Sequence, residues 1–226
     1  MVPMRDYEGP DRASISNRMN TDMKFIVGRK EKMVTFIGND GMATAATLIG
    51  VKASVVTQVK NKSTDGYEAV QIGFGTRNAK NISKAVQGHV GDLGSFATIR
   101  EFRVADSATW KKGDTLDASL FTVGEEVTVS GVSKGKGFQG VVKRHGFHGG
   151  PRSHGQKHSE REAGSIGGGG RAGGRVIKSM RMPGRMGSDR VTVKGLRVLG
   201  VDTTNGKILV SGCVPGIPGA ILEIKA

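Results

Sequence analysis

Four histidines lie among cations between Lys143 and His158, and they are the side chains whose spacing first suggests chemistry. The run reads KRHGFHGGPRSHGQKH, and its histidines are His145, His148, His154 and His158. Clustered imidazoles can bind zinc, but the run holds no cysteine or carboxylate, and its cations oppose a divalent metal. We therefore expect no metal here, and we predict that these rings and Phe147 stack on bases or donate to phosphates. Solvated loop histidines are the alternative.

The segment before this run, Ser133 to Gly140, has a composition that suits phosphate contact. It reads SKGKGFQG, in which the glycines let the backbone approach a phosphate and the two lysines supply charge. It lacks the G-x-x-x-x-G-K-[ST] spacing, and a strand-like pattern follows where a nucleotide-binding loop requires a helix. The segment therefore predicts contact with an RNA backbone and not a nucleotide site.

Two later segments combine arginine with glycine or methionine. Gly167 to Arg175 reads GGGGRAGGR, which offers arginines that can fork onto phosphates and almost nothing to pack, although a flexible linker has the same composition. Arg175 to Arg190 reads RVIKSMRMPGRMGSDR, in which methionines give adaptable apolar contacts between phosphate-binding arginines. A loop that packs back on the body is a compatible interpretation of this second segment.

All these segments belong to one stretch, Gly131 to Arg190, which holds thirteen Lys and Arg residues against three acids. It carries +10 of the net charge of +14, and its few large apolar residues cannot build a core. A polyanion is therefore the expected partner, and RNA is the natural candidate. The predicted RNA-binding residues are Lys134, Lys136, Lys143, Arg144, His145, Arg152, His154, Lys157, His158, Arg161, Arg171, Arg175, Lys178, Arg181, Arg185 and Arg190.

No enzyme constellation accompanies this charge. The chain has no nucleophile elbow, no H-E-x-x-H and no dinucleotide fingerprint, and its acids form no recognisable acid/base pair. We predict no catalytic residue, cofactor, metal or small-molecule substrate. Cys213 is the one cysteine, so no intrachain disulfide can form, and we expect it in the core. No apolar run approaches the roughly 18 residues that a membrane-spanning helix needs, so no membrane partner is expected.

Short β-branched runs with turn signals between them flank the basic stretch on both sides. They predict a mainly all-β fold built as a closed antiparallel barrel, with one or two short helices at about 77–97. The stretch 133–190 is then an insertion in a body made of 23–132 and 191–226, and 1–22 is expected to be a disordered extension. The expected strands are 24–28, 32–37, 42–51, 54–60, 67–74, 98–104, 125–132, 191–201, 207–214 and 221–225.

Four stretches make this chain similar to the bacterial-type large-subunit ribosomal protein L3 family. They are VSGVSKGKGFQGVVKR at 129–144, GGPRSHGQKH at 149–158, GSIG at 164–167 and MPGRMGSDRVTV at 182–193, with VPGIPG at 214–219 in support. The resemblance implies a Greek-key-type barrel of the kind shared by translation proteins. It also implies that the insertion reaches toward the peptidyl transferase centre, with 164–174 as its innermost part.

The resemblance further implies a function. Members of the family are structural constituents of the cytoplasmic ribosome and are not enzymes. They bind large-subunit ribosomal RNA directly near its end, nucleate early assembly of the large subunit and lie beside neighbouring ribosomal proteins. A free-standing RNA-binding chaperone or regulator outside the ribosome is the alternative.

The chain departs from the family's pattern in three places. Glycines fill 168–170, followed by Arg171, where some relatives carry a methylated glutamine, so we predict no such modification. Lys32 stands where glycine is usual, which leaves the path of the first turn, 28–33, open. Residues 1–22 match nothing in the family's pattern.

Overall fold

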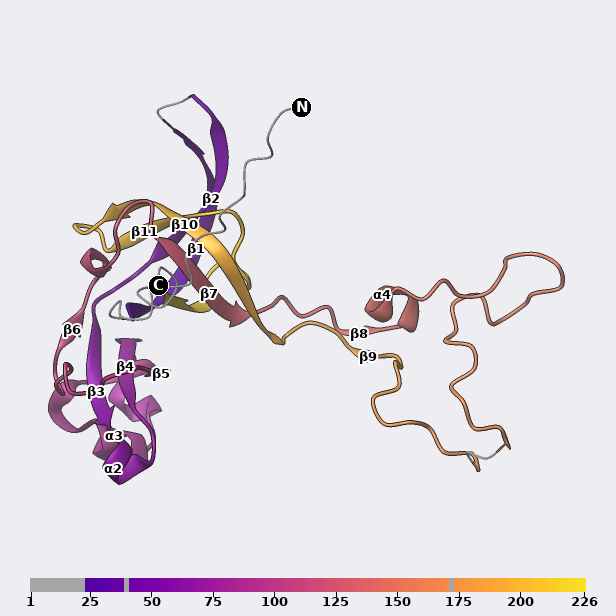
Figure 1. Cartoon of the computed structure of the whole chain (residues 1–226), viewed down its shortest axis with the longest axis horizontal. Helices are drawn as coiled ribbons and strands as arrows, with labels where there is room; N and C mark the ends of the chain where they lie inside the picture. Colours follow the sequence, from indigo (N-terminus) through magenta and orange to yellow (C-terminus); the bar gives the residue numbers. More distant parts are fainter. Residues whose placement is uncertain (1–22, 39–40, 171–172) are drawn as a thin grey trace, which may run out of the picture.

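The computed structural model describes residues 23–38, 41–170 and 173–226. Figure 1 shows a body of two sheets from which one long arm projects to the side. The elements are β1 (Phe25–Ile37), β2 (Ala43–Gly50), β3 (Ser54–Lys60), α2 (Lys62–Asp65), β4 (Ala69–Thr76), η2 (Ala79–Asn81), α3 (Lys84–Val90), η3 (Gly91–Leu93), β5 (Phe96–Arg103), β6 (Thr115–Leu116), η4 (Ala118–Leu120), β7 (Glu126–Val132), β8 (Phe138–Gln139), α4 (Val141–His145), β9 (Gly184–Arg185), β10 (Arg190–Asp202), β11 (Lys207–Ser211) and β12 (Ile221–Lys225).

Six strands close into an antiparallel barrel in the order β1, β12, β7, β10, β11, β2. β7, β10 and β11 are successive barrel strands, and β12 then returns to lie beside β7, which is the Greek-key order. Side chains alternate across a strand, so Val127 and Val129 of β7 both point into the barrel and are buried. The predicted closed antiparallel Greek-key barrel is confirmed.

The strands between residues 54 and 116 form a second sheet, in the order β5, β4, β3, β6. The sequence pattern predicts these residues to lie in the barrel body, because their alternation is of the same kind as that of the barrel strands. Short helices lie between β4 and β5, as predicted for about 77–97. Alternation shows that a segment is a strand, but the choice of sheet depends on which distant strand it pairs with.

A stack of aromatic rings joins the two sheets through one core. Phe25 of β1 lies against Phe102 of β5, with ring centroids 4.8 Å apart and nearly parallel planes, and it also contacts Trp110 at 5.2 Å. Phe25 and Phe102 are fully buried. Burial of a large apolar side chain contributes roughly 1.5–3 kcal/mol, so this contact makes the barrel and the second sheet one packed body.

The first strand corrects the expectation of two strands separated by a turn at 28–33. β1 is continuous, and its pairing with β2 shifts between Lys30 and Met33, which marks a β-bulge. Lys30 is the last paired residue before this bulge and is buried, and its Nζ donates to the carbonyl oxygens of Val214 at 2.8 Å and Gly216 at 3.1 Å. Burial and the nearby Lys134 ammonium lower the pKa of Lys30. The bulge therefore aims a charged anchor at the Pro-Gly loop before β12.

The prediction that Cys213 lies in the core is wrong. β11 ends at Ser211, and Gly212 turns the chain with a φ of 73°, so the strand alternation does not continue to Cys213. The thiol is exposed and lies 3.9 Å from the sulfur of Met33.

One carboxylate links both sheets and the root of the arm. Glu223 of β12 is only 8 % exposed. It accepts hydrogen bonds from both terminal nitrogens of Arg190 on β10, one of them 2.9 Å long, and Arg100 Nε of β5 lies 3.1 Å away. The hydrogen bond to Glu223 raises the pKa of Arg190 against the opposing effect of burial. Paired charges at a buried carboxylate are costly to separate.

We expect Glu223→Gln to lower the free energy of unfolding by about 1–3 kcal/mol, because two charge-assisted hydrogen-bond partners lose their acceptor charge while remaining partly solvated. Urea denaturation of the full chain measures the change. Glu126→Gln, on the exposed face of β7, is the matched control and should change stability by less than about 0.5 kcal/mol. Equal effects of the two substitutions would contradict the assigned role of Glu223.

The second sheet should make stability depend on pH through Glu101. Burial alone would raise the pKa of this carboxyl, but hydrogen bonds from Lys60 and Tyr67 outweigh burial and lower it. A depressed folded-state pKa stabilises the protein above the unfolded value, near 4.3, and this contribution is lost as the pH falls through the folded value. Urea denaturation between about pH 3 and pH 6 should therefore show a steeper loss for the natural chain than for Glu101→Gln. Parallel curves would disprove this coupling.

Candidate nucleic-acid interface

The arm, residues 133–189, starts as a two-stranded stalk. Its ends lie side by side, because Val132 of β7 pairs with Arg190 of β10. Beyond them, Ser133 N donates to Asp189 O and Lys136 N to Met186 O, both at 2.9 Å, and β8 then pairs with β9. Figure 1 shows the two chains leaving the barrel together before they separate. Strand pairing therefore directs the arm away from the body.

Gly187 allows the two chains of the stalk to approach closely. Its φ is 73°, in the left-handed region that favours glycine. A Cβ at this position would collide with the carbonyl oxygen of Lys134 on the opposite chain. The stalk thus requires glycine at position 187. The sequence alone does not distinguish this glycine from the many others in the chain.

A short helix, α4, follows Gly140 directly, where the sequence predicted a strand, and it links the outgoing chain to the returning chain. It ends at Gly146, whose left-handed conformation caps it. Arg144 Nη1 donates to the carbonyl oxygen of Met182 at 2.8 Å, and His145 Nε2 lies 3.0 Å from the same oxygen. Both side chains are half-buried, so these two predicted RNA-binding residues brace the arm. Val141 of α4 is the single buried residue of the arm's described part.

Beyond α4 the arm opens into two loops, visible at its far end in Figure 1. In the first, Gly150 N donates to Glu160 O at 2.9 Å, and Arg152 Nε lies 2.6 Å from a carboxylate oxygen of Glu160. In the second, Gly174 N donates to Gly168 O at 3.2 Å. The prediction for Arg171 falls outside the described residues.

Most of the predicted RNA-binding side chains are exposed and make no hydrogen bond or ion pair within the described ranges. They come from both chains of the stalk and from both loops. Two acids of the arm, Glu160 and Asp189, pair with other arginines. The side chains of this group therefore remain available to bind phosphate. They are Lys134, Lys136, Lys143, His154, Lys157, His158, Arg161, Arg175, Lys178 and Arg181.

Three other predicted cations are paired inside the protein. Arg152 with Glu160 and Arg185 with Asp189 form exposed pairs at 2.6 Å and 3.4 Å. Exposed pairs contribute little, so these two arginines can exchange a carboxylate for a phosphate at small cost. Arg190 differs, because the buried carboxylate of Glu223 already balances its charge. Its observed partner supports a role in anchoring the arm.

The histidines of the arm do not gather around a common point. His145 belongs to α4, whereas His154 and His158 lie in the first loop. Among the residues with a described position, no group of three or more His, Cys, Asp or Glu side chains could hold a metal ion. Within the same ranges, the structure contains no helix of the length and apolarity needed to cross a membrane.

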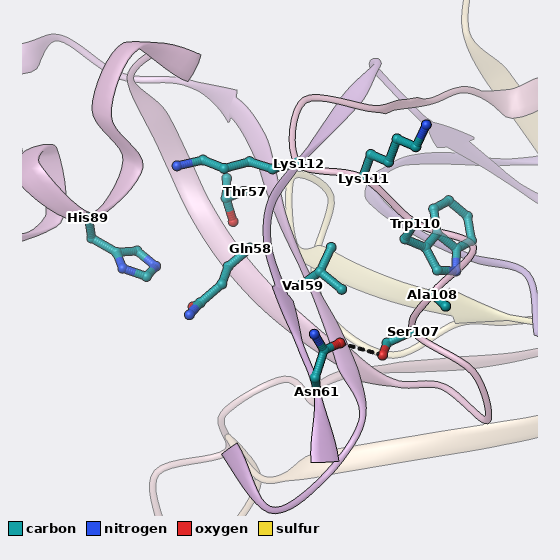
Figure 2. A pocket seen from close by; sticks show the side chains of 10 residues that line it. All are labelled: Thr57, Gln58, Val59, Asn61, His89, Ser107, Ala108, Trp110, Lys111 and Lys112. Atoms are coloured by element: carbon teal, nitrogen blue, oxygen red, sulfur yellow. Dashed lines mark hydrogen bonds between the residues drawn. The ribbon is translucent and has the colours of Figure 1, made fainter. Parts of the chain in front are cut away.

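A pocket of about 580 Å³ opens on the second sheet, away from the arm (Figure 2). Several of its polar side chains are engaged within the protein: Ser107 Oγ donates to Asn61 Oδ1 at 2.7 Å, and His89 Nε2 lies 2.7 Å from Gln71 Oε1. None of the residues that line it is a carboxylate or a thiol. The pocket therefore presents no acid/base pair and no activated nucleophile.

Sequence reasoning missed the residues that fix the arm to the body. Glu223 is one acid in the run ILEIK, and its neighbours Leu222 and Ile224 are buried as well. An isolated acid inside an apolar strand is the only signal that marks it. Its partners Arg100 and Arg190 are far away in the sequence, so no local pattern connects them to it.

Known proteins are similar to this chain over most of its length. The family model described as Ribosomal protein L3 matches residues 86–214. The protein named large ribosomal subunit protein uL3 of Alkaliphilus metalliredigens is 42 % identical over 205 residues, which are 90 % of this chain and 97 % of that relative. The proteins of the same name from Desulforudis audaxviator and Roseiflexus are each 45 % identical, over 90 % and 88 % of this chain and 95 % of each relative.

We expect Gly187→Ala to open the stalk while leaving the barrel folded. A left-handed alanine costs about 1–2 kcal/mol before any collision with Lys134 O is counted. Hydrogen exchange at the amides of Lys136 and Met186 should therefore accelerate roughly tenfold or more. Gly140→Ala is the control, because Gly140 has an extended backbone and open space around its α-carbon. If both variants exchange like the natural chain, the stalk does not depend on glycine at 187.

Proposed function

This chain belongs to the ribosomal protein L3 family, and we propose that its arm binds large-subunit ribosomal RNA directly. As a member of this family, the chain is a structural constituent of the large ribosomal subunit. The family is not a family of enzymes. We further propose that the arm extends toward the peptidyl transferase centre and that the protein binds near an end of the RNA. It would nucleate early assembly in the cytoplasm, beside neighbouring ribosomal proteins.

One observation carries the proposal: the arm is rich in unpaired cations and nearly devoid of core. Val141 is its one buried residue in the described ranges, and the free cations extend from Lys134 in the stalk to Arg181 on the return. Such a segment gains little by folding on itself. Phosphate supplies the missing countercharge, and each contact releases condensed counterions from the RNA.

The stalk and the loops have different roles in the proposed binding of RNA. Backbone pairing fixes the direction of the stalk, because the stalk continues the paired strands β7 and β10 of the barrel. The loops have few internal bonds and many glycines, so they can follow the surface of a folded RNA. Recognition would then rest on RNA shape and backbone, with flat side chains fitting unpaired bases.

A free-standing RNA chaperone would use a similar arm, and co-sedimentation separates the two functions. A structural constituent follows large subunits at one copy per particle through a high-salt wash. A chaperone is washed away, and that outcome would overturn the ribosomal assignment while leaving RNA binding intact.

Removing arm cations should reduce the salt dependence of RNA binding more than removing body cations. We expect the variant with Lys143, Lys157, Arg161 and Arg175 all changed to Gln to lower the slope of log K against log salt by about 3, at roughly 0.7–0.9 per phosphate contact. Filter binding of the full chain to transcribed large-subunit ribosomal RNA, from about 50 to 200 mM salt, gives the slope.

The matched control removes the same charge from exposed positions of the body: Lys52, Lys62, Lys80 and Lys84, all changed to Gln. Its slope should stay close to that of the natural chain. If the two quadruple variants lose equal slope, net charge alone governs binding, and the arm is not the interface.

A further inference from the structure

Phe147 separates two hollows at the point where the chain leaves α4. One, of about 320 Å³, is lined by Phe147 and residues 177–181. The other, of about 520 Å³, is lined by residues 145–151 and by parts of the first loop, and it shares Phe147 and Arg181 with the first. The ring of Phe147 is half-buried and forms a wall that the two hollows share.

The ring is held in place before any ligand arrives. His145 lies beside it, with ring centroids 6.0 Å apart and planes tilted by 45°. His145 is itself fixed, because its Nε2 lies 3.0 Å from the carbonyl oxygen of Met182. A flat aromatic surface that is already oriented loses little conformational freedom when it binds.

The smaller hollow combines an apolar wall with a cationic rim. Phe147, Ile177 and Met180 supply the wall, and Ile177 is 72 % exposed. Lys178 and Arg181 lie at the rim, exposed and without a hydrogen-bond or ion-pair partner in the described ranges. A planar apolar group with an adjacent negative charge would complement both parts.

We propose that this hollow receives one unstacked RNA base, which stacks on Phe147 while Lys178 and Arg181 contact the flanking phosphates. The inference rests on the proposed function and adds a base-binding site to an interface otherwise made of phosphate contacts. An apolar side chain of a neighbouring protein would fill the same wall. It would leave both rim cations unpaired, so the charges favour a nucleotide.

The test uses Phe147→Leu, which keeps an apolar side chain but removes the flat ring. We expect binding of the full chain to large-subunit ribosomal RNA to weaken roughly 5- to 150-fold, the range found for loss of one stacked base. The salt slope should stay unchanged, because no cation is lost. Phe147→Trp should restore the affinity. By contrast, changing both Lys178 and Arg181 to Gln should lower the slope by about 1.5.

Phe36→Leu is the matched control, because Phe36 is half-buried like Phe147 but lies on β1 of the body. Its RNA affinity should equal that of the natural chain. If Phe147→Leu binds RNA as tightly as the natural chain, or if Phe36→Leu loses as much affinity as Phe147→Leu, the base site is overturned while RNA binding by the arm remains intact. Absence of RNA binding by the natural chain would instead overturn the proposed function.

A second measurement does not depend on how well Phe147→Leu folds. In the double variant Trp110→Phe with Phe147→Trp, the only indole lies at the proposed site. Stacking on a base should quench its emission when ribosomal RNA is added, and should protect it from acrylamide. Unchanged emission together with full access to acrylamide in the bound state would show that an RNA base does not occupy the hollow.

Discussion

The buried carboxylate of Glu223 is the interaction on which the arrangement of the molecule depends. It receives Arg100 from the second sheet and Arg190 from the first position of the strand that follows the arm. Removing a carboxylate from water is costly, and two guanidinium groups offset that cost with charge-assisted hydrogen bonds. The same pairing fixes how the second sheet meets the barrel and where the arm begins.

Charge and apolar surface are distributed unequally between the two parts of the chain. The body contains a continuous core in which Phe25 and Phe102 stack across two sheets. The arm contains one buried side chain, Val141, in its described part, together with cations that have no internal partner. Stability therefore comes from the body, whereas the cations that we propose to bind RNA lie on the arm. The paired stalk connects these two parts by carrying strand pairing from the barrel into the arm.

Local patterns predicted local structure, and pairing at long range decided the rest. β3 has the bounds that its β-branched run indicated, and the barrel closed as expected. The division into two sheets was not predicted, because alternation in 54–60 is compatible with either sheet. The density of Lys and Arg in the sequence predicted that the arm carries free cations, but it did not predict the roles of Arg144 and Arg190. Their partners, Met182 and Glu223, lie more than thirty residues away in the sequence.

The pairing of Val132 with Arg190 means that the arm is a doubled chain without a free end. A single tail can be drawn lengthwise through a narrow opening, whereas a closed loop needs a passage wide enough for two strands and the helix turn between them. If the arm enters RNA as we propose, the passage that receives it must therefore admit both chains of the stalk at once.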